Sequence, residues 1–287
     1  MRRIGRGALV ALLAAAALSA AHSQSLRPTP ISQPAATFGP FSGVARQGTL
    51  LLGTAPAGTT QLTLDGAPIE MARDGRFLIA FDRDAGPHAA LVATLADGRS
   101  VTKDFDVAPG EWRLERLDRV ARTPVPDAEF ERRRPPELEQ IKAARALRSD
   151  ADGWRQRFIW PATGRISGLF GAQRIYRGEP GAYHGGVDIA KPTGSPVVAP
   201  ADGVVILAAP SPFTLEGNLL MIDHGMGLNS AFLHLSQIEV RVGDHIRQGQ
   251  EIGRVGATGR ASGPHLHWAM MWQGRRIDPM RVAGAMN

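Results

Sequence analysis

Short apolar runs separated by turn residues occupy most of the chain. Between residues 38 and 108, apolar clusters at 50–52 and 77–81 alternate with Asp-Gly pairs at 65–66 and 97–98. Apolar runs of this length, bounded by hairpin-type turns, predict short strands rather than helices. We therefore predict a small β-sandwich domain over residues 38–108.

The same pattern returns after residue 159. Apolar runs at 204–207, 219–222 and 252–255 are separated by turn sequences such as the Pro-Ala-Asp-Gly at 200–203. No helical periodicity of useful length appears, and the 33 glycines and 21 prolines favour short strands and turns. The sequence therefore predicts a mainly β protein with a second, β-rich domain over residues 159–287.

The segment between these regions, residues 109–158, has a different composition. It is rich in Arg and Glu and contains the paired prolines Pro135 and Pro136. We interpret it as a partly helical linker, with a short helix from Glu137 to Leu147 whose start is set by the prolines. The linker could pack across either domain or remain a solvated tether.

The N-terminus has the pattern of an export signal. Arg2, Arg3 and Arg6 precede an apolar run at 8–17, and small residues follow at 19–21. This order predicts a signal peptide over residues 1–23, and hence a periplasmic or secreted protein. An uncleaved membrane anchor is the alternative, although the run is short for a bilayer. No other stretch is apolar enough to span, so we predict that the protein is not integral to a membrane.

The composition limits the chemistry that the chain can perform. There is no cysteine, which excludes disulfides, thiolate metal sites, cysteine nucleophiles and a lipid-modified cysteine. A metal site must therefore use histidines and carboxylates. The formal net charge is +6, but the signal arginines supply three of these charges, and we predict no nucleic-acid partner.

Six of the eight histidines lie between His184 and His267. His184 and Asp188 are separated by Gly185, Gly186 and a valine, which favours a loop running into a strand. Glycine allows the backbone to turn tightly enough to bring both side chains inward. Imidazole nitrogen and carboxylate oxygen are both good zinc ligands, so this pair is a candidate metal site.

Two further patterns carry histidines. His265 and His267 are two apart in a predicted strand, so both project from the same face. His234 sits in the apolar run 231–235, where a buried structural histidine is the alternative to a site role. His224 and His245 are interpreted as turn residues.

Together these patterns resemble the lysostaphin-type zinc peptidases, also called the β-lytic endopeptidase family. The resemblance covers about residues 160–282. It rests on the order and separation of three motifs: H-x-x-x-D at 184–188, His-Leu-Ser at 234–236 and H-x-H at 265–267. The matching framework segments are 185–188, 196–200, 222–225 and 256–259.

The resemblance implies that His184, Asp188 and His267 bind a zinc ion. It maps the two remaining site histidines to His234 and His265, which we predict to be catalytic. Three protein ligands would leave the fourth zinc position open, as in catalytic rather than structural sites. No His-Glu-x-x-His motif supplies a general base, so one of these histidines must serve as the base while the other stabilises the oxyanion. Which histidine has which role is left open.

The chain departs from the family pattern at two positions near the site. Phe232 stands where many members have Tyr, and Ala269 where many have Glu. Neither position is a ligand, so these departures concern substrate contacts rather than metal binding. Asn218 falls at a commonly matched position, and no role is assigned to it.

By this resemblance, the predicted function is that of an exported zinc metalloendopeptidase that hydrolyses peptide cross-links of peptidoglycan. The alternative is a non-enzymatic or autoinhibited regulator of other cell-wall hydrolases. The N-terminal region could target, inhibit or merely space the peptidase domain, and a regulatory protein partner stays open. A biotinyl or lipoyl carrier is excluded because no lysine follows Lys191.

Overall fold

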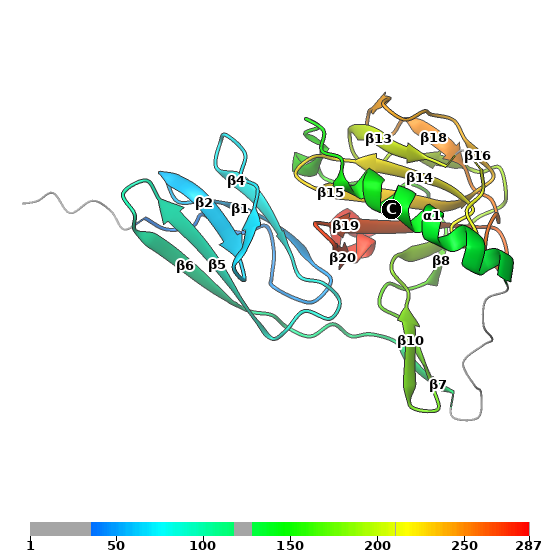
Figure 1. Cartoon of the computed structure of the whole chain (residues 1–287), viewed down its shortest axis with the longest axis horizontal. Coiled ribbons are helices and arrows are strands. Elements are labelled where there is room, and N and C mark those ends of the chain that lie inside the picture. The colour runs from blue at the N-terminus through cyan, green and yellow to red at the C-terminus, as the bar shows by residue number, and fades with distance from the viewer. Residues whose placement is uncertain (1–35, 118–127, 210, 287) are drawn as a thin grey trace, which may run out of the picture. The chain divides into compact units, whose positions relative to one another are not determined.

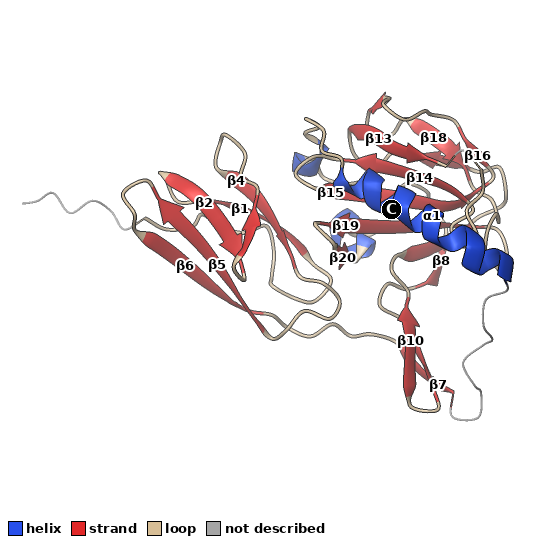
Figure 2. Ribbon diagram, in the orientation of Figure 1, coloured by secondary structure: helices blue, strands red, loops and turns tan. Residues whose placement is uncertain are grey.

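The computed structural model describes residues 36–117, 128–209 and 211–286. Strands form most of the regular structure in these ranges (Figure 2), which confirms the prediction of a mainly β protein. The predicted signal peptide, residues 1–23, lies outside the described residues. Within the described ranges, no helix has both the length and the apolarity that a bilayer crossing requires.

The predicted N-terminal β region contains two antiparallel sheets. One has four strands in the order β3-β2-β5-β6, and the other pairs β1 with β4. The strands are β1 (Leu50–Thr54), β2 (Thr59–Leu64), β3 (Ala67–Ile69), β4 (Arg76–Ala80), β5 (His88–Leu95) and β6 (Ser100–Asp106). Every second residue of β5 is buried, as expected for a strand with one face on a core. The sandwich and its boundaries at 38 and 108 remain predictions.

The segment predicted as a linker contains more structure than expected. Strand β7 (Leu114–Leu117) pairs in parallel with β9 (Gln173–Tyr176), and β10 (Glu179–Tyr183) completes this three-stranded sheet. The linker therefore contributes a strand to a sheet formed with C-terminal residues.

The helix in this segment is longer than predicted. Helix α1 runs from Ala128 to Ala146, so the prediction of a start at Glu137 was wrong. Proline removes a backbone donor and crowds the preceding turn, but its fixed φ angle is itself helical. Side-chain contacts hold α1 in place on both sides of the prolines: Arg134 binds Glu216, and Glu137 accepts a hydrogen bond from the Thr214 backbone N–H.

The C-terminal region is built on an eight-stranded antiparallel sheet. Its order is β17-β13-β14-β15-β19-β11-β8, with β20 paired to β19. The members are β8 (Arg165–Gly168), β11 (Val187–Ala190), β13 (Gly203–Ala208), β14 (Asn218–Asp223), β15 (Leu228–Leu235), β17 (His245–Ile246), β19 (His265–Trp272) and β20 (Arg275–Ile277). A smaller sheet joins β12 (Pro196–Val198), β18 (Glu251–Arg254) and β16 (Gln237–Ile238). The short helices are η1 (Gly153–Arg155) and α2 (Pro279–Ala283).

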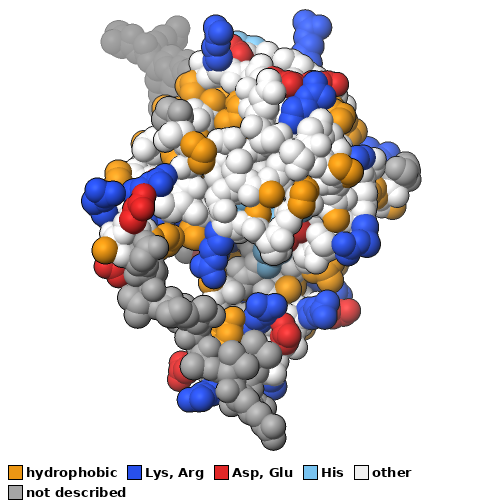
Figure 3. Space-filling view, turned by 90° about the vertical axis from the view of Figure 1, so that its right-hand side faces the viewer, with side chains coloured by type: hydrophobic (Ala, Val, Ile, Leu, Met, Phe, Trp, Pro, Cys, Tyr) orange, Lys and Arg blue, Asp and Glu red, His pale blue; other side chains and the backbone are white. Residues whose placement is uncertain are grey.

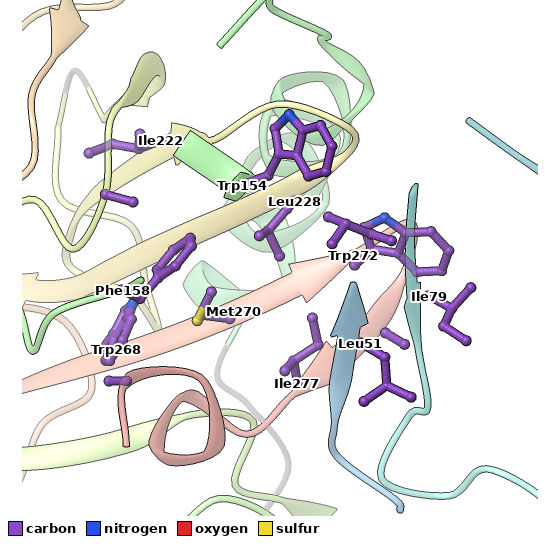
Figure 4. Packing of buried hydrophobic residues seen from close by; sticks show 14 of the residues in the cluster. Leu51, Ile79, Trp154, Phe158, Ile222, Leu228, Trp268, Met270, Trp272 and Ile277 are labelled. Carbon is purple, nitrogen blue, oxygen red and sulfur yellow. The ribbon is translucent and has the colours of Figure 1, made fainter. Parts of the chain in front are cut away.

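Alternate side chains of strand β19 point to the two faces of the large sheet, and one of these faces packs on the core. Leu266, Trp268, Met270 and Trp272 alternate along it and are buried. Figure 4 shows Trp268, Met270 and Trp272 packed with buried residues from other elements. The residues between them, beginning with His265 and His267, face the other side of the sheet.

Helix α1 covers part of that opposite face. Its buried residues Ile141 and Ala144 pack in one cluster with Leu219 and Met221 of β14 and Ala231 of β15. In Figure 1 the helix crosses these strands. The histidine-bearing face of the sheet is therefore open at one end and covered by α1 at the other.

Candidate metal centre and catalytic groove

His184 and Asp188 lie where the sequence predicted a loop running into a strand. His184 follows β10, and Asp188 is the second residue of β11. Gly186 lies in such close contact with β19 that an added Cβ would be 2.7 Å from His267 Nε2. An added Cβ on Gly168 would be 2.3 Å from Asp188 Oδ2. Both positions therefore require glycine for the site to close.

The register of the sheet brings His267 to this pair. Strands β11 and β19 are antiparallel, and Asp188 lies directly opposite His267. The alternating burial of β19 turns Leu266 and Trp268 into the core and leaves His265 and His267 on the groove side. Asp188 and His267, which are far apart in the sequence, thus lie side by side because their strands pair and because alternate residues of a strand share one face.

Three side-chain atoms converge in this site. His184 Nε2 lies 3.0 Å from both Asp188 Oδ1 and His267 Nδ1, and His267 Nδ1 lies 2.8 Å from Asp188 Oδ1. In the described residues, this group alone has the arrangement of histidine and carboxylate atoms that could hold a metal ion. Two nitrogens and one oxygen suit zinc and leave its fourth position open. The residues present therefore fit the cofactor that the sequence predicted.

Backbone carbonyls orient the site histidines. The Nδ1–H groups of His184, His234 and His265 donate to the carbonyl oxygens of Leu169, Thr258 and Gly263, at 3.0, 2.8 and 2.8 Å. Each of these bonds fixes the ring orientation, and in the neutral ring it leaves Nε2 as the nitrogen that can bind a metal or accept a proton.

The charges of the group are coupled. Burial raises the pKa of Asp188, but hydrogen bonds from His184 and His267 outweigh this and hold its pKa well below the usual range. Burial lowers the pKa of His184, yet the hydrogen bond and charge of Asp188 raise it overall. Burial also lowers the pKa of His267, and its net shift is downward. The low pKa of Asp188 thus keeps a carboxylate ionised where a cation would bind.

His234 and His265 lie beside this group without belonging to it. Their ring centroids are 4.8 Å apart, and His265 Nε2 is 3.7 Å from Asp188 Oδ1. His234 has a left-handed backbone with φ of 64°, a conformation that costs energy and is concentrated at functional sites. Burial lowers the pKa of His234 to about 4, so the ring is neutral near pH 7.

Asn218 has a structural position next to His234. Its side-chain N–H donates to the carbonyl of Leu235, 2.8 Å away, and its backbone N–H donates to Thr258 Oγ1 at 2.9 Å. These bonds connect the start of β14 to the end of β15 and to the residue whose carbonyl orients His234. Asn218, at a position commonly matched in the family, therefore helps to hold Thr258, whose carbonyl orients His234.

His224 is a buried residue in a hydrogen-bond network, next to the turn that was predicted for it. Its Nδ1–H donates to the Asp202 carbonyl at 2.8 Å, and its Nε2 accepts from Ser230 Oγ at 2.9 Å. Ser230 Oγ in turn accepts from Trp268 Nε1. The network therefore ends at Trp268, on the core face of β19. His245 is exposed and opens β17.

The site histidines and Asp188 line a groove of about 850 Å³. Helix α1 contributes Arg134, Leu138, Ile141 and Arg145 to its walls, and Arg276 contributes from β20. Figure 3 shows histidine atoms near the middle of one face of the molecule, with Lys and Arg side chains on more than one side of them. Sequence reasoning missed Arg145 and Arg276, because no local motif connects a linker helix with a C-terminal strand.

Comparison with known proteins agrees with this geometry. The sequence model of peptidase family M23 matches residues 182–279, which contain all five predicted site residues. The peptidoglycan DD-endopeptidase ShyA of Vibrio cholerae is 39% identical over 128 residues, 44% of this chain and 29% of ShyA. The DD-carboxypeptidase/endopeptidase Mpg of Neisseria meningitidis is 40% identical over 123 residues, 42% of this chain and 27% of Mpg. The matched part of the chain thus spans under a third of each of these relatives.

A solved structure matches more of the chain. A Pseudomonas aeruginosa protein assigned to peptidase M23 superposes with a TM-score of 0.66 at 27% identity, over 85% of this chain and 97% of that one. The similarity in fold therefore extends beyond residues 182–279 into the preceding elements. The family resemblance predicted from the motifs is confirmed.

Proposed function

We propose that this protein, in which residues 182–279 form a domain of peptidase family M23, is a zinc metalloendopeptidase that hydrolyses peptide cross-links of peptidoglycan. The observation that carries the proposal is the convergence of His184, Asp188 and His267 beside two histidines with free Nε2 atoms in one groove. The names of ShyA and Mpg support both the reaction type and the substrate class.

In this proposal His184 Nε2, Asp188 Oδ1 and His267 Nδ1 hold the zinc ion. When bound, zinc supplies Lewis-acid chemistry that activates a water molecule and polarises a peptide carbonyl. The carbonyl of Leu169 orients His184, and the pairing of β11 with β19 fixes Asp188 against His267. These contacts hold the ligands in place before the substrate arrives.

His234 and His265 perform the proton transfers and stabilise negative charge. Hydrolysis needs one group that accepts a proton from water and one that stabilises the oxyanion or protonates the leaving amine. Because Nδ1–H of each ring donates to a backbone carbonyl, each Nε2 is the atom that faces the reaction. His234 is neutral near pH 7, so its Nε2 can accept a proton there.

Mass spectrometry of fragments released from purified peptidoglycan tests this function. The protein should release fragments with cleaved cross-links, and a zinc chelator should stop the release. His234→Ala and His265→Ala should each reduce it strongly, whereas His245→Ala, an exposed histidine away from the groove, should not. Chelator-insensitive cleavage, or cleavage unaffected by both site variants, would contradict the proposal.

We also propose that the protein acts in the cell envelope, as a periplasmic or secreted chain from which residues 1–23 have been removed. The arginine head, the short apolar run and the small residues at 19–21 support this. N-terminal sequencing of the protein isolated from its native host should find a first residue near position 22–24. An intact N-terminus on the native protein would contradict it.

A further inference from the structure

Among the described residues, two arginines that form no ion pair both line the α1 end of the groove. Arg145 comes from the last turn of α1 and Arg276 from β20, and both line the groove with the metal-site residues. No carboxylate of the described residues lies within 4.0 Å of either guanidinium, although many other arginines have such a partner. In the part of the chain that the structure describes, Arg145 Nε is the one buried side-chain polar atom without a hydrogen-bond partner.

The neighbouring arginine of the same helix shows the contrast. Arg134 also lines the groove, but its guanidinium forms two hydrogen bonds with Glu216, of 2.6 and 2.8 Å, and a further contact of 3.4 Å with Glu137. Arg134 thus holds α1 on the sheet and has few N–H donors left for a ligand. The guanidinium groups of Arg145 and Arg276 form no ion pair with the described residues, so their donors can bind one.

Arg276 is held in place next to the metal site. An added Cβ on Gly185, which follows the ligand His184, would lie 3.5 Å from both Cδ and Nε of Arg276. Its guanidinium carbon is 5.2 Å from the centre of the Tyr183 ring, and its backbone N–H donates to Asp82 Oδ2 at 2.7 Å. Arg276 is an exposed residue, and its charged group lies beside Tyr183 and Gly185, the two residues that flank His184 in the chain.

The two positive charges are close enough to disfavour each other. Burial lowers the pKa of Arg145, the charge of Arg276 lowers it further, and the charge of Glu216 offsets these effects only in part. A recess of about 20 Å³ lies between the two side chains and is lined also by Gly185 and Ala231. A space of this size holds one small polar group, such as an oxygen of an anionic head, and no more.

We propose that Arg145 and Arg276 form a carboxylate-binding subsite, which holds an acidic group of the substrate peptide next to the scissile bond on the His184 side. The inference rests on the proposed function, because the groove is the place where that peptide would lie. A guanidinium presents its donors in a fork that matches a carboxylate, and charge-assisted bonds of this kind are about twice as strong as neutral ones. A carboxylate would also satisfy Arg145 Nε and offset the repulsion between the two arginines.

The test compares two synthetic cross-linked peptides that are identical except that one acidic group is a carboxylate in the first and an amide in the second. We expect the wild-type kcat/KM to favour the carboxylate peptide by about tenfold or more, since hydrogen bonds to charged groups contribute at this level. In Arg276→Gln and Arg145→Gln this ratio should fall toward one. Arg247→Gln, which changes an exposed arginine outside the groove, should keep the wild-type ratio.

Calorimetric binding of the same two peptides separates this subsite from the reaction itself. Arginine-dependent preference for the carboxylate peptide without cleavage would support the subsite and contradict the proposed function. Cleavage of both peptides with equal kcat/KM would contradict the subsite and leave the peptidase standing. If the arginine variants lose kcat/KM equally on both peptides, so that the ratio between the peptides is unchanged, Arg145 and Arg276 have only a structural role. This result would overturn the inference.

Discussion

At the scale of single residues, backbone carbonyls fix the Nδ1 atoms of three candidate site histidines, His184, His234 and His265. The carbonyls of Leu169, Thr258 and Gly263 accept the fixed protons, so each ring is oriented independently of a bound metal. The proposed coordinating atoms of His184, Asp188 and His267 are about 3 Å apart. Loss of one member leaves two ligands, too few to hold zinc as a three-ligand site does.

The first prediction concerns zinc content. His184→Ala should abolish the retention of one zinc per chain, because Nε2 of this ring is one of three converging atoms that could hold the ion. His245→Ala removes a histidine exposed at the start of β17 and should keep the wild-type content. The measurement is atomic absorption on dialysed protein, and one zinc per chain in His184→Ala would show that the ligand assignment is wrong.

The second prediction concerns pH and the buried His224. Burial lowers its pKa to about 4 in the folded chain, whereas an unfolded chain binds this proton below about pH 6.5. The unfolded state therefore carries more protons between pH 4 and 6.5, so stability falls as the pH drops through this range. The contribution at stake is on the order of 3 kcal/mol.

Urea unfolding of wild-type and His224→Gln proteins at pH 7, 6, 5 and 4.5 checks this. The variant should be less stable at pH 7, because it disturbs the bonds to Asp202 and Ser230. It should also lose less stability than the wild type as the pH falls. Parallel pH profiles would mean that His224 does not titrate in this way.

At the scale of elements, strand β19 and helix α1 define the groove from opposite sides. Along β19 the core residues and the site residues alternate, which places two histidines on one face. Helix α1 covers the far end of that face through Ile141 and Ala144. The helix is therefore both a structural cover and part of the groove wall.

The third prediction tests that packing. Ile141→Ala should destabilise the protein by about 2–4 kcal/mol, since the side chain is 7% exposed in an apolar cluster and its loss leaves a cavity. Leu147→Ala removes a side chain that is 51% exposed just after the helix and should cost under about 1 kcal/mol. Equal unfolding midpoints for both variants in urea would show that α1 is not docked on the sheet.

The elements also show which features could be predicted from the sequence. The spacing of His265 and His267 in a strand places them on one face without knowledge of the fold, and Gly185 and Gly186 mark the turn at His184. The pairing of β7 with β9, which joins residues about 60 positions apart, leaves no local pattern in either segment. The start of α1 before Pro135 was missed because tertiary contacts of Arg134 and Glu137 stabilise a helix that local rules would end. Arg145 and Arg276 could not be predicted as groove residues for a similar reason, because only the fold brings α1 and β20 to the same groove.

At the scale of the whole molecule, residues of the N-terminal sheets and of the C-terminal region share one core. Leu51 and Ile79 belong to the same buried cluster as Trp272 and Ile277 (Figure 4). Arg83, which is 7% exposed, donates to the Gly171 carbonyl from two nitrogens and to Gln173 Oε1. These contacts join the N-terminal region to the loop whose Gly171 N–H donates to the carbonyl of His184.

The fourth prediction addresses this connection. Arg83→Met should destabilise the protein by about 1–3 kcal/mol, because it leaves the Gly171 carbonyl without its side-chain partner. Arg99→Met removes an exposed arginine whose side chain pairs locally with Asp97 and should cost under about 1 kcal/mol. Thermal unfolding compares the two variants. Equal melting temperatures would show that the bonds of Arg83 to Gly171 and Gln173 do not stabilise the protein.

In the proposed function, a single zinc ion at His184, Asp188 and His267 makes this chain a peptidoglycan endopeptidase. The most direct measurement adds zinc in steps to metal-free protein and records the release of cleaved cross-links from purified peptidoglycan. We predict that release rises in proportion to added zinc and levels off at one equivalent per chain. Full release without zinc, or no release from a folded chain that has bound one zinc, would contradict the proposed function.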